Sequence, residues 1–141
     1  MGVLTSVLDT IFLIYFALHI PTTILVDSQS VIPAEYFPPW AKELLQWHID
    51  TNGDHLVSKN PVWFKSLVAC ELALQLPLFF VITYGFLRRR NWIRMPCILY
   101  GTHVATTMAP ILADILFGLD STSPKKLNLA LIYLPYLVIP L

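Results

Sequence analysis

A long apolar segment with a carboxylic acid near its middle is the feature that most constrains the fold. Residues 61–87 form this segment, which is long enough to cross a bilayer as a helix of about 20 residues. Gln75 follows Glu71 one turn later on the same helical face, and Pro77, for which a structural role is expected, comes just after. An acid at that depth in hydrocarbon costs about 2.5 to 3.5 kcal/mol on insertion scales. Glu71 is therefore expected to face a protein-lined cavity.

The composition places the chain among membrane proteins. Hydrophobic residues make up 56% of the 141 residues and charged residues only 13%, more apolar surface than a soluble domain of this size could bury. The length allows one domain, residues 1–141. A net charge of zero argues against nucleic acid as a partner. The sequence has neither a metal-ligand spacing nor a phosphate-binding loop, so we expect no metal and no other cofactor.

Four apolar segments predict an all-α polytopic membrane protein, a bundle of four transmembrane helices. The segments are residues 3–26, 61–87, 92–117 and 127–141. The first is not followed by a small-residue cleavage site, so we interpret it as a retained span. The fourth covers about 22 Å, less than a hydrocarbon core of about 30 Å. We therefore expect that a C-terminal tail is missing from this chain.

The polar segments predict the orientation in the membrane. Residues 40–49 alternate apolar and polar positions with a helical period, so we expect a short amphipathic helix at the membrane surface, anchored by Trp40 and Trp47. Residues 88–94 are the most basic part of the chain and are cytoplasmic by the positive-inside rule. The loop of residues 28–60 would then be lumenal and both termini cytoplasmic.

Each predicted span carries one polar face, and four such faces could enclose a pocket. The residues concerned are His19, Thr23 and Asp27 in the first span, Glu71 and Gln75 in the second, His103, Thr107 and Asp114 in the third, and Tyr133 and Tyr136 in the fourth. An alternative is hydrogen bonding between helices, worth about 0.6 kcal/mol per contact. For His19 this packing role remains open. The carboxyl groups of Glu71 and Asp27 are harder to explain in that way, which favours a ligand pocket.

Short motifs along nearly the whole chain carry a family resemblance. They are Leu18-His19-Ile20-Pro21-Thr22-Thr23, Asp27, Val31-Ile32-Pro33, Pro61-Val62-Trp63-Phe64-Lys65-Ser66, Cys70-Glu71-Leu72, Gln75-Leu76-Pro77, Trp92-Ile93-Arg94, Thr106-Thr107 and Tyr133-Leu134-Pro135-Tyr136. In this order and spacing they resemble the sigma-2 receptor family. That family belongs to the EXPERA group, together with the sterol isomerase called emopamil-binding protein.

The resemblance implies a fold, a location and partners. It implies a single EXPERA-like four-helix domain in the membrane of the endoplasmic reticulum, with a membrane-enclosed pocket for sterols and cationic amphiphilic drugs. It also implies a homodimer and a link to cholesterol handling and the Niemann–Pick type C cholesterol transporter. The lysine-rich tail expected to retain such a protein in the endoplasmic reticulum is absent from this sequence.

The resemblance also implies roles for individual residues. Asp27 would pair with a ligand ammonium, and Glu71 would hydrogen-bond Asp27. Asp54 resembles the second acidic position of the family, for which we expect a structural role in holding the lumenal loop. The remaining residues expected to line the cavity are His19, Gln75, Thr107, Tyr133 and Tyr136.

Electrostatics fit a carboxyl pair that binds an amine. Two carboxyl groups in one low-dielectric site cannot both ionise cheaply, so the pair is expected to carry about one negative charge and to suit one protonated amine. The predicted function is binding of cationic amphiphiles and of sterols, cholesterol or an oxysterol, in lipid homeostasis.

Two other functions remain open. One is a sterol isomerase with Glu71 and Asp27 as acid and base and a histidine, His19 or His103, as an auxiliary. The acid–histidine pattern of the isomerase branch is, however, not reproduced in this sequence. The other is a membrane adaptor whose pocket is vestigial.

Overall fold

The described part of the chain is all-helical and contains two helical segments that are able to cross a membrane. The computed structural model describes residues 3–118 and 124–140, and its regular elements there are all helices. Among the described residues, two helical segments are long and apolar enough to cross a membrane, Ser6–Ser30 and Val62–Leu87. Helix α6 (Arg94–Phe117) has sufficient length but is not one of these two, and α7 (Lys126–Val138) is a shorter apolar helix. Two of the four predicted spans therefore meet this criterion.

The first span consists of two helical elements. Helix α1 (Val3–Leu25) is followed by the 3₁₀-helix η1 (Asp27–Ser30). The side chains of Ser28 and Gln29 donate hydrogen bonds to the carbonyls of Ile24 and Leu25, and these bonds satisfy acceptors that the end of α1 leaves free. The polar stripe expected on one continuous helix is therefore divided, because Asp27 lies in η1.

A π-helical turn interrupts the second span. Helix α4 (Val62–Cys70) leads into the π-helix η3 (Glu71–Gln75), which leads into α5 (Leu76–Leu87). Pro77 lies in the first turn of α5, directly after this wide turn. A proline has no N–H to donate, and its ring would clash with the carbonyl four residues earlier in a regular helix. The wide turn accommodates Pro77, and π-turns inside helices are frequent at functional sites.

The predicted amphipathic helix is present, and a second short helix follows it. Helix α2 (Pro39–Asn52) begins after the 3₁₀-helix η2 (Ala34–Tyr36), and Gly53 ends it in the left-handed region with φ 65°. Both of its tryptophans, Trp40 and Trp47, are exposed. Helix α3 (His55–Lys59) is capped by Asp54, whose Oδ1 accepts hydrogen bonds from two backbone N–H groups.

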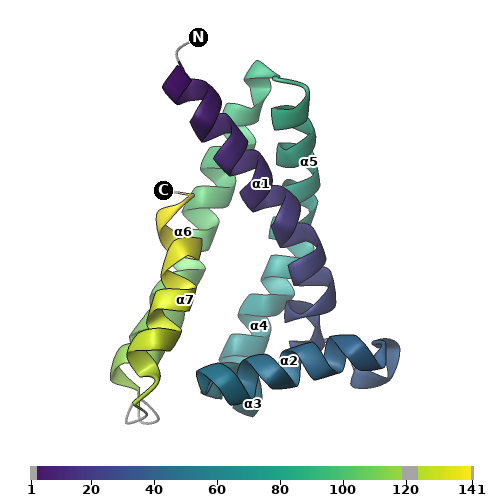
Figure 1. Ribbon diagram of the computed structural model, residues 1–141, viewed down its shortest axis with the longest axis vertical. Helices are drawn as coiled ribbons and strands as arrows, with labels where there is room; N and C mark the ends of the chain where they lie inside the picture. The colour runs from purple at the N-terminus through teal and green to yellow at the C-terminus, as the bar shows by residue number, and fades with distance from the viewer. Residues whose placement is uncertain (1–2, 119–123, 141) are drawn as a thin grey trace.

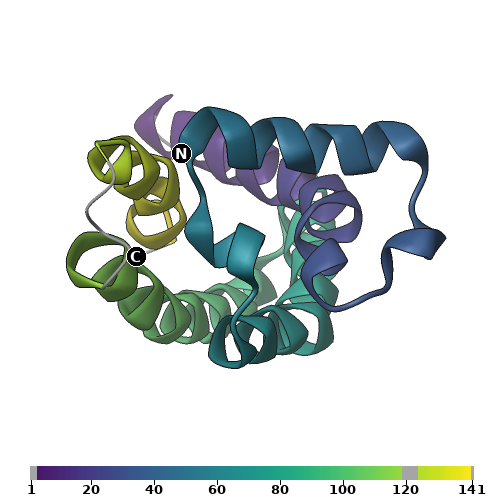
Figure 2. The same ribbon diagram turned by 90° about the horizontal axis from the view of Figure 1, so that it is seen from below.

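The long helices form two packed pairs. Helix α1 packs on α5, and α6 packs on α7. The pairs approach each other where α5 turns through the 3₁₀-helix η4 (Asn91–Ile93) into α6, and α2 crosses the opposite end of the molecule (Figure 1). Seen from that end, α2 and α3 lie across the ends of the long helices (Figure 2). The two helix pairs and this cross-piece together frame the interior.

Aromatic rings fill the interior between the pairs. Phe16, Phe79 and Tyr100 are buried and contact one another edge-on or tilted, with ring centroids 5.1 to 6.1 Å apart. The hydroxyl groups of Tyr15 and Tyr100 are 3.0 Å apart and hydrogen-bonded. Such packing fixes the position of α1 relative to α5 and α6.

The contact between α6 and the residues that directly follow α7 depends on Gly101. A Cβ added at this glycine would lie 2.9 Å from the carbonyl oxygen of Pro140. Gly101→Val is therefore expected to destabilise the protein by about 1 to 3 kcal/mol, because the two backbones would have to separate. Thermal unfolding in detergent measures this, with Thr102→Val at an exposed neighbouring position as the control. Equal melting temperatures for the two variants would contradict the prediction.

Candidate functional site

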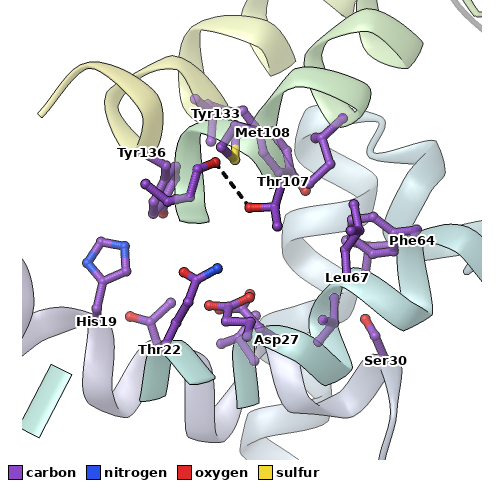
Figure 3. A pocket seen from close by; sticks show the side chains of 18 of the residues that line it. His19, Thr22, Asp27, Ser30, Phe64, Leu67, Thr107, Met108, Tyr133 and Tyr136 are labelled. Carbon is purple, nitrogen blue, oxygen red and sulfur yellow. Dashed lines mark hydrogen bonds between the residues drawn. The ribbon is translucent and has the colours of Figure 1, made fainter. Parts of the chain in front are cut away.

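A cavity of about 320 Å³ lies between the helices. Its walls come from α1 with η1, from α2 and α3, from α4 with η3, and from α6 and α7. This volume lies at the lower end of the range of small-molecule sites, about 300 to 1,000 Å³. Figure 3 shows Asp27 and His19 on one side of the cavity and Tyr133 and Tyr136 on the other. Apolar side chains such as Met108 make up much of the remaining wall.

Two carboxyl groups face this cavity. Asp27 and Glu71 both line it, and Thr23 donates a hydrogen bond to Glu71 Oε1 at 3.0 Å. The hydrogen bond expected between Asp27 and Glu71 stays a prediction, and the described partner of Glu71 Oε1 is the hydroxyl of Thr23. Within residues 3–118 and 124–140, neither carboxyl group has a cationic partner in an ion pair. The cavity therefore combines apolar walls with acids that no described cation neutralises.

An aromatic wall stands opposite the acids. Tyr133 and Tyr136 of α7 line the cavity, with ring centroids 6.3 Å apart. Their rings are suited to cation–π contacts, which are worth about 0.5 to 2 kcal/mol. Tyr133 is fixed in place because its hydroxyl donates a hydrogen bond to Asp54 Oδ2 at 2.7 Å.

His19 has a packing role and also lines the cavity. Its Nδ1 donates a hydrogen bond to the Tyr15 carbonyl at 2.8 Å, since a carbonyl can only accept. Its Nε2 is buried and has no hydrogen-bond partner. The ring meets Tyr136 edge-on at a centroid distance of 5.0 Å. The packing interpretation of His19 thus accounts for one ring nitrogen and leaves the other unpaired.

The remaining polar wall comes from η3 and α6. Gln75 is buried at the cavity wall, and its Nε2 lies 3.0 Å from Nδ1 of His103. Thr107 also lines the cavity and donates a hydrogen bond to the Val104 carbonyl. The residues named from the sequence as cavity-lining therefore converge on one cavity: His19, Asp27, Glu71, Gln75, Thr107, Tyr133 and Tyr136.

Two other polar residues of the third predicted span are not among the cavity-lining residues. His103 contacts the cavity wall through Gln75. Asp114 pairs with His55, with Nε2 and Oδ2 2.8 Å apart, and so joins α6 to α3. The polar face of α6 is thus shared between the cavity and a contact between helices.

Asp54 holds the segment between the two apolar spans together from inside the protein. Its side chain is fully buried; Oδ1 accepts from Leu56 and Val57, and Oδ2 accepts from Tyr133 and lies 3.0 Å from His48 Nε2. Burial alone would raise the pKa of Asp54, but the hydrogen bonds from His48, Tyr133 and Val57 outweigh it and lower the pKa below its ordinary value. Asp54 thereby joins α2, α3 and α7.

Sequence reasoning missed the part of the wall that α2 provides. Leu44, Leu45, Trp47 and His48 all line the cavity. The signal was present, because 44, 45 and 48 have the i, i+1, i+4 spacing of one helical face. That face was interpreted as lying on the membrane, and amphipathic spacing alone does not distinguish a lipid surface from a protein cavity.

Comparison with known proteins identifies the family. Residues 40–141 match the family described as EXPERA (EXPanded EBP superfamily). Sigma intracellular receptor 2 of Xenopus tropicalis is 43% identical over 149 aligned residues, covering 99% of this chain and 87% of the relative. The Homo sapiens protein of that name is 41% identical over 139 residues, which cover 90% of this chain and 79% of the relative. Efficient mitochondria targeting-associated protein 19 of Saccharomyces cerevisiae is 33% identical over 150 residues, which cover 92% of this chain and 91% of the relative. The chain belongs to the sigma-2 receptor family within the EXPERA superfamily.

Proposed function

We propose that this protein binds cationic amphiphilic molecules and sterols in the cavity and takes part in sterol homeostasis. The observation that carries the proposal is the position of Asp27 and Glu71, which face an apolar cavity without a described cationic partner. A ligand ammonium would supply the missing charge and form a charge-assisted hydrogen bond with Asp27. The apolar body of the ligand would pack against α6 and the tyrosines of α7.

The arrangement in the membrane is part of the proposal. We place α6 and α7 in the bilayer beside the two apolar helices, which makes a four-span bundle with both termini in the cytoplasm. The basic turn between α5 and α6 supports this orientation. Family membership supports the membrane of the endoplasmic reticulum, a homodimer, and the Niemann–Pick type C cholesterol transporter as a partner.

A sterol isomerase is the second candidate. An acid and a base facing one apolar cavity are the groups that moving a double bond requires, and Glu71 and Asp27 satisfy this. In the described part of the chain, however, neither carboxyl group is hydrogen-bonded to a histidine: Nδ1 of His19 bonds the Tyr15 carbonyl, and Nδ1 of His103 lies beside the Gln75 amide. This arrangement favours binding over catalysis.

Saturation binding tests the proposed function. A radiolabelled cationic amphiphile is titrated into the purified protein, and cholesterol or an oxysterol is added as a competitor. We expect saturable binding that sterols displace competitively, because both ligands occupy one cavity. Folded protein without saturable binding would contradict the proposal. Turnover of a sterol by the purified protein would instead establish the isomerase.

The cavity can be filled selectively from α6. Thr107 lines the cavity, whereas its neighbour Thr106 is exposed and is not among the cavity-lining residues. Overfilling a packed site costs about 1 to 3 kcal/mol, so Thr107→Phe is expected to weaken amine binding about ten- to hundredfold. Thr106→Phe, the matched control, should bind like the unchanged protein. Equal affinities of the two variants would show that the ligand binds elsewhere.

A further inference from the structure

Four arginines cluster at the end of the molecule opposite α2. Three of them, Arg88, Arg89 and Arg90, are exposed in the turn that joins α5 to α6 (Figure 1), and the exposed Arg94 begins α6. Arg88 lies over the ring of Tyr84, 6.0 Å from its centroid. Among the described residues, these guanidinium groups have no carboxylate partner. The turn therefore presents concentrated positive charge without a counter-charge from the described protein.

Arg89 has a backbone conformation that glycine adopts more easily than arginine. The N–H of Arg89 bonds the Phe86 carbonyl, and the N–H of Arg90 bonds the Gly85 carbonyl, which is the hydrogen-bond pattern of a Schellman helix end. Arg89 occupies the left-handed position of this motif with φ 48°, where glycine is strongly preferred. An arginine costs conformational energy there, so any benefit must come from its guanidinium group.

The turn is also held in a fixed geometry. A Cβ added at Gly85 would overlap the Ile93 side chain, so Ile93 packs directly on the backbone of α5. This contact fixes η4 against the end of α5, and α6 starts at Arg94 directly after η4. The arginines thus project from a preorganised frame, which lowers the entropic cost of binding an anion.

The location relative to the bilayer determines which anion the arginines meet. The apolar span Val62–Leu87 ends immediately before Arg88, and Leu87 is exposed. The arginines therefore stand where hydrocarbon gives way to lipid headgroups, and Trp92, 47% exposed, stands with them as an interfacial anchor. Guanidinium groups bind phosphate bidentately, and clustered basic residues beside a span attract anionic lipids.

We propose that Arg88, Arg89 and Arg90 form a binding site for the phosphate of an anionic phospholipid in the adjoining leaflet. Arg94 adds to the positive potential of the site from the start of α6. This site is independent of the cavity and of the proposed function. It would anchor the α5–α6 end to one leaflet and is expected to weaken as ionic strength rises.

Fluorescence quenching tests the proposal with the full chain. The protein is reconstituted in phosphatidylcholine vesicles containing brominated phosphatidylserine or, in equal proportion, brominated phosphatidylcholine. Trp92 emission is obtained by subtracting the signal of a matched Trp92→Phe protein. The brominated anionic lipid should quench Trp92 more strongly than the brominated phosphatidylcholine does.

Variants of Arg89 separate its charge from its backbone strain. Arg89→Gly removes the charge and relieves the backbone, so the preference for the anionic lipid should fall about fivefold while the melting temperature rises. Arg89→Lys keeps the charge and the strain but loses the bidentate guanidinium, so it should retain part of the preference, more than Arg89→Gly does.

Three results would overturn the proposal. The first is equal quenching of Trp92 by the two brominated lipids. The second is an undiminished anionic preference in Arg89→Gly. The third is loss of the preference in sodium phosphate but not in sodium chloride of the same ionic strength, which would assign the site to free phosphate. A higher melting temperature together with a weaker preference for anionic lipid in Arg89→Gly would support the proposal. If the arginine had only a structural role, its replacement would change stability without changing the lipid preference.

Discussion

Asp27→Asn is expected to abolish binding of cationic amphiphiles while the protein stays folded. Asparagine keeps the size of the side chain but cannot carry the negative charge that pairs with an ammonium in an apolar cavity. Removing one partner of a buried charge pair costs about 2 to 5 kcal/mol, so affinity should fall about thirtyfold or more. Saturation binding of a radiolabelled amine to the purified variant measures this loss.

Two comparisons make the Asp27 experiment specific. Asp9→Asn changes an acid of α1 that is not among the cavity-lining residues and should leave binding unchanged. Glu71→Gln keeps an oxygen that can accept a hydrogen bond from Thr23 and should weaken binding less than Asp27→Asn.

Binding of the amine by the unchanged protein should also fall at acid pH, as the carboxyl pair loses its charge. Retained affinity in folded Asp27→Asn protein would refute the assignment of the amine site.

Asp54→Ala is expected to be the most destabilising of the substitutions considered. The buried carboxylate caps α3, bonds Tyr133 of α7 and contacts His48 of α2, so its removal leaves several buried donors without an acceptor. Loss of one member of such a buried network costs about 3 to 5 kcal/mol. Thermal unfolding in detergent measures the loss, and Asp54→Asn, which retains one carbonyl acceptor, should cost less. A cost below about 1 kcal/mol for Asp54→Ala would contradict the structural role.

Asp54 also gives stability a definite pH dependence. Its pKa is lower in the folded protein than the ordinary value of 3.8, so its contribution is fully present above that value. The contribution is lost as pH falls through the lower folded pKa. Acid unfolding should therefore depend on Asp54 below about pH 4, and the Asp54→Asn protein should lack this part of the dependence. Identical pH dependence in the two proteins would show that Asp54 is not a source of acid sensitivity.

Much of the cavity was predictable because its residues follow helical spacing. Glu71 lies deep in an apolar segment and Gln75 follows one turn later, and both side chains line the cavity. The spacing of Tyr133 and Tyr136 predicted the wall from α7 in the same way. In each case a polar side chain within an apolar segment indicated which face of the helix points inward.

Other features lie beyond the reach of periodicity. The stripe through Asp27 assumed one continuous helix, whereas hydrogen bonds from Ser28 and Gln29 end α1 before that residue. The π-turn at Glu71–Gln75 depends on how Pro77 is accommodated, and a regular 3.6-residue pattern does not contain that information. The role of Thr23 as the partner of Glu71 depends on side-chain distances that become defined only when α1 packs beside η3.

The most direct test of the central claim is a structure of the protein with a cationic amphiphile bound. We expect the ligand inside the cavity, with its ammonium nitrogen about 2.8 Å from a carboxylate oxygen of Asp27. The aromatic rings of Tyr133 and Tyr136 should then contact the ligand. A ligand whose ammonium group lies outside the cavity, or away from both Asp27 and Glu71, would contradict the proposed function.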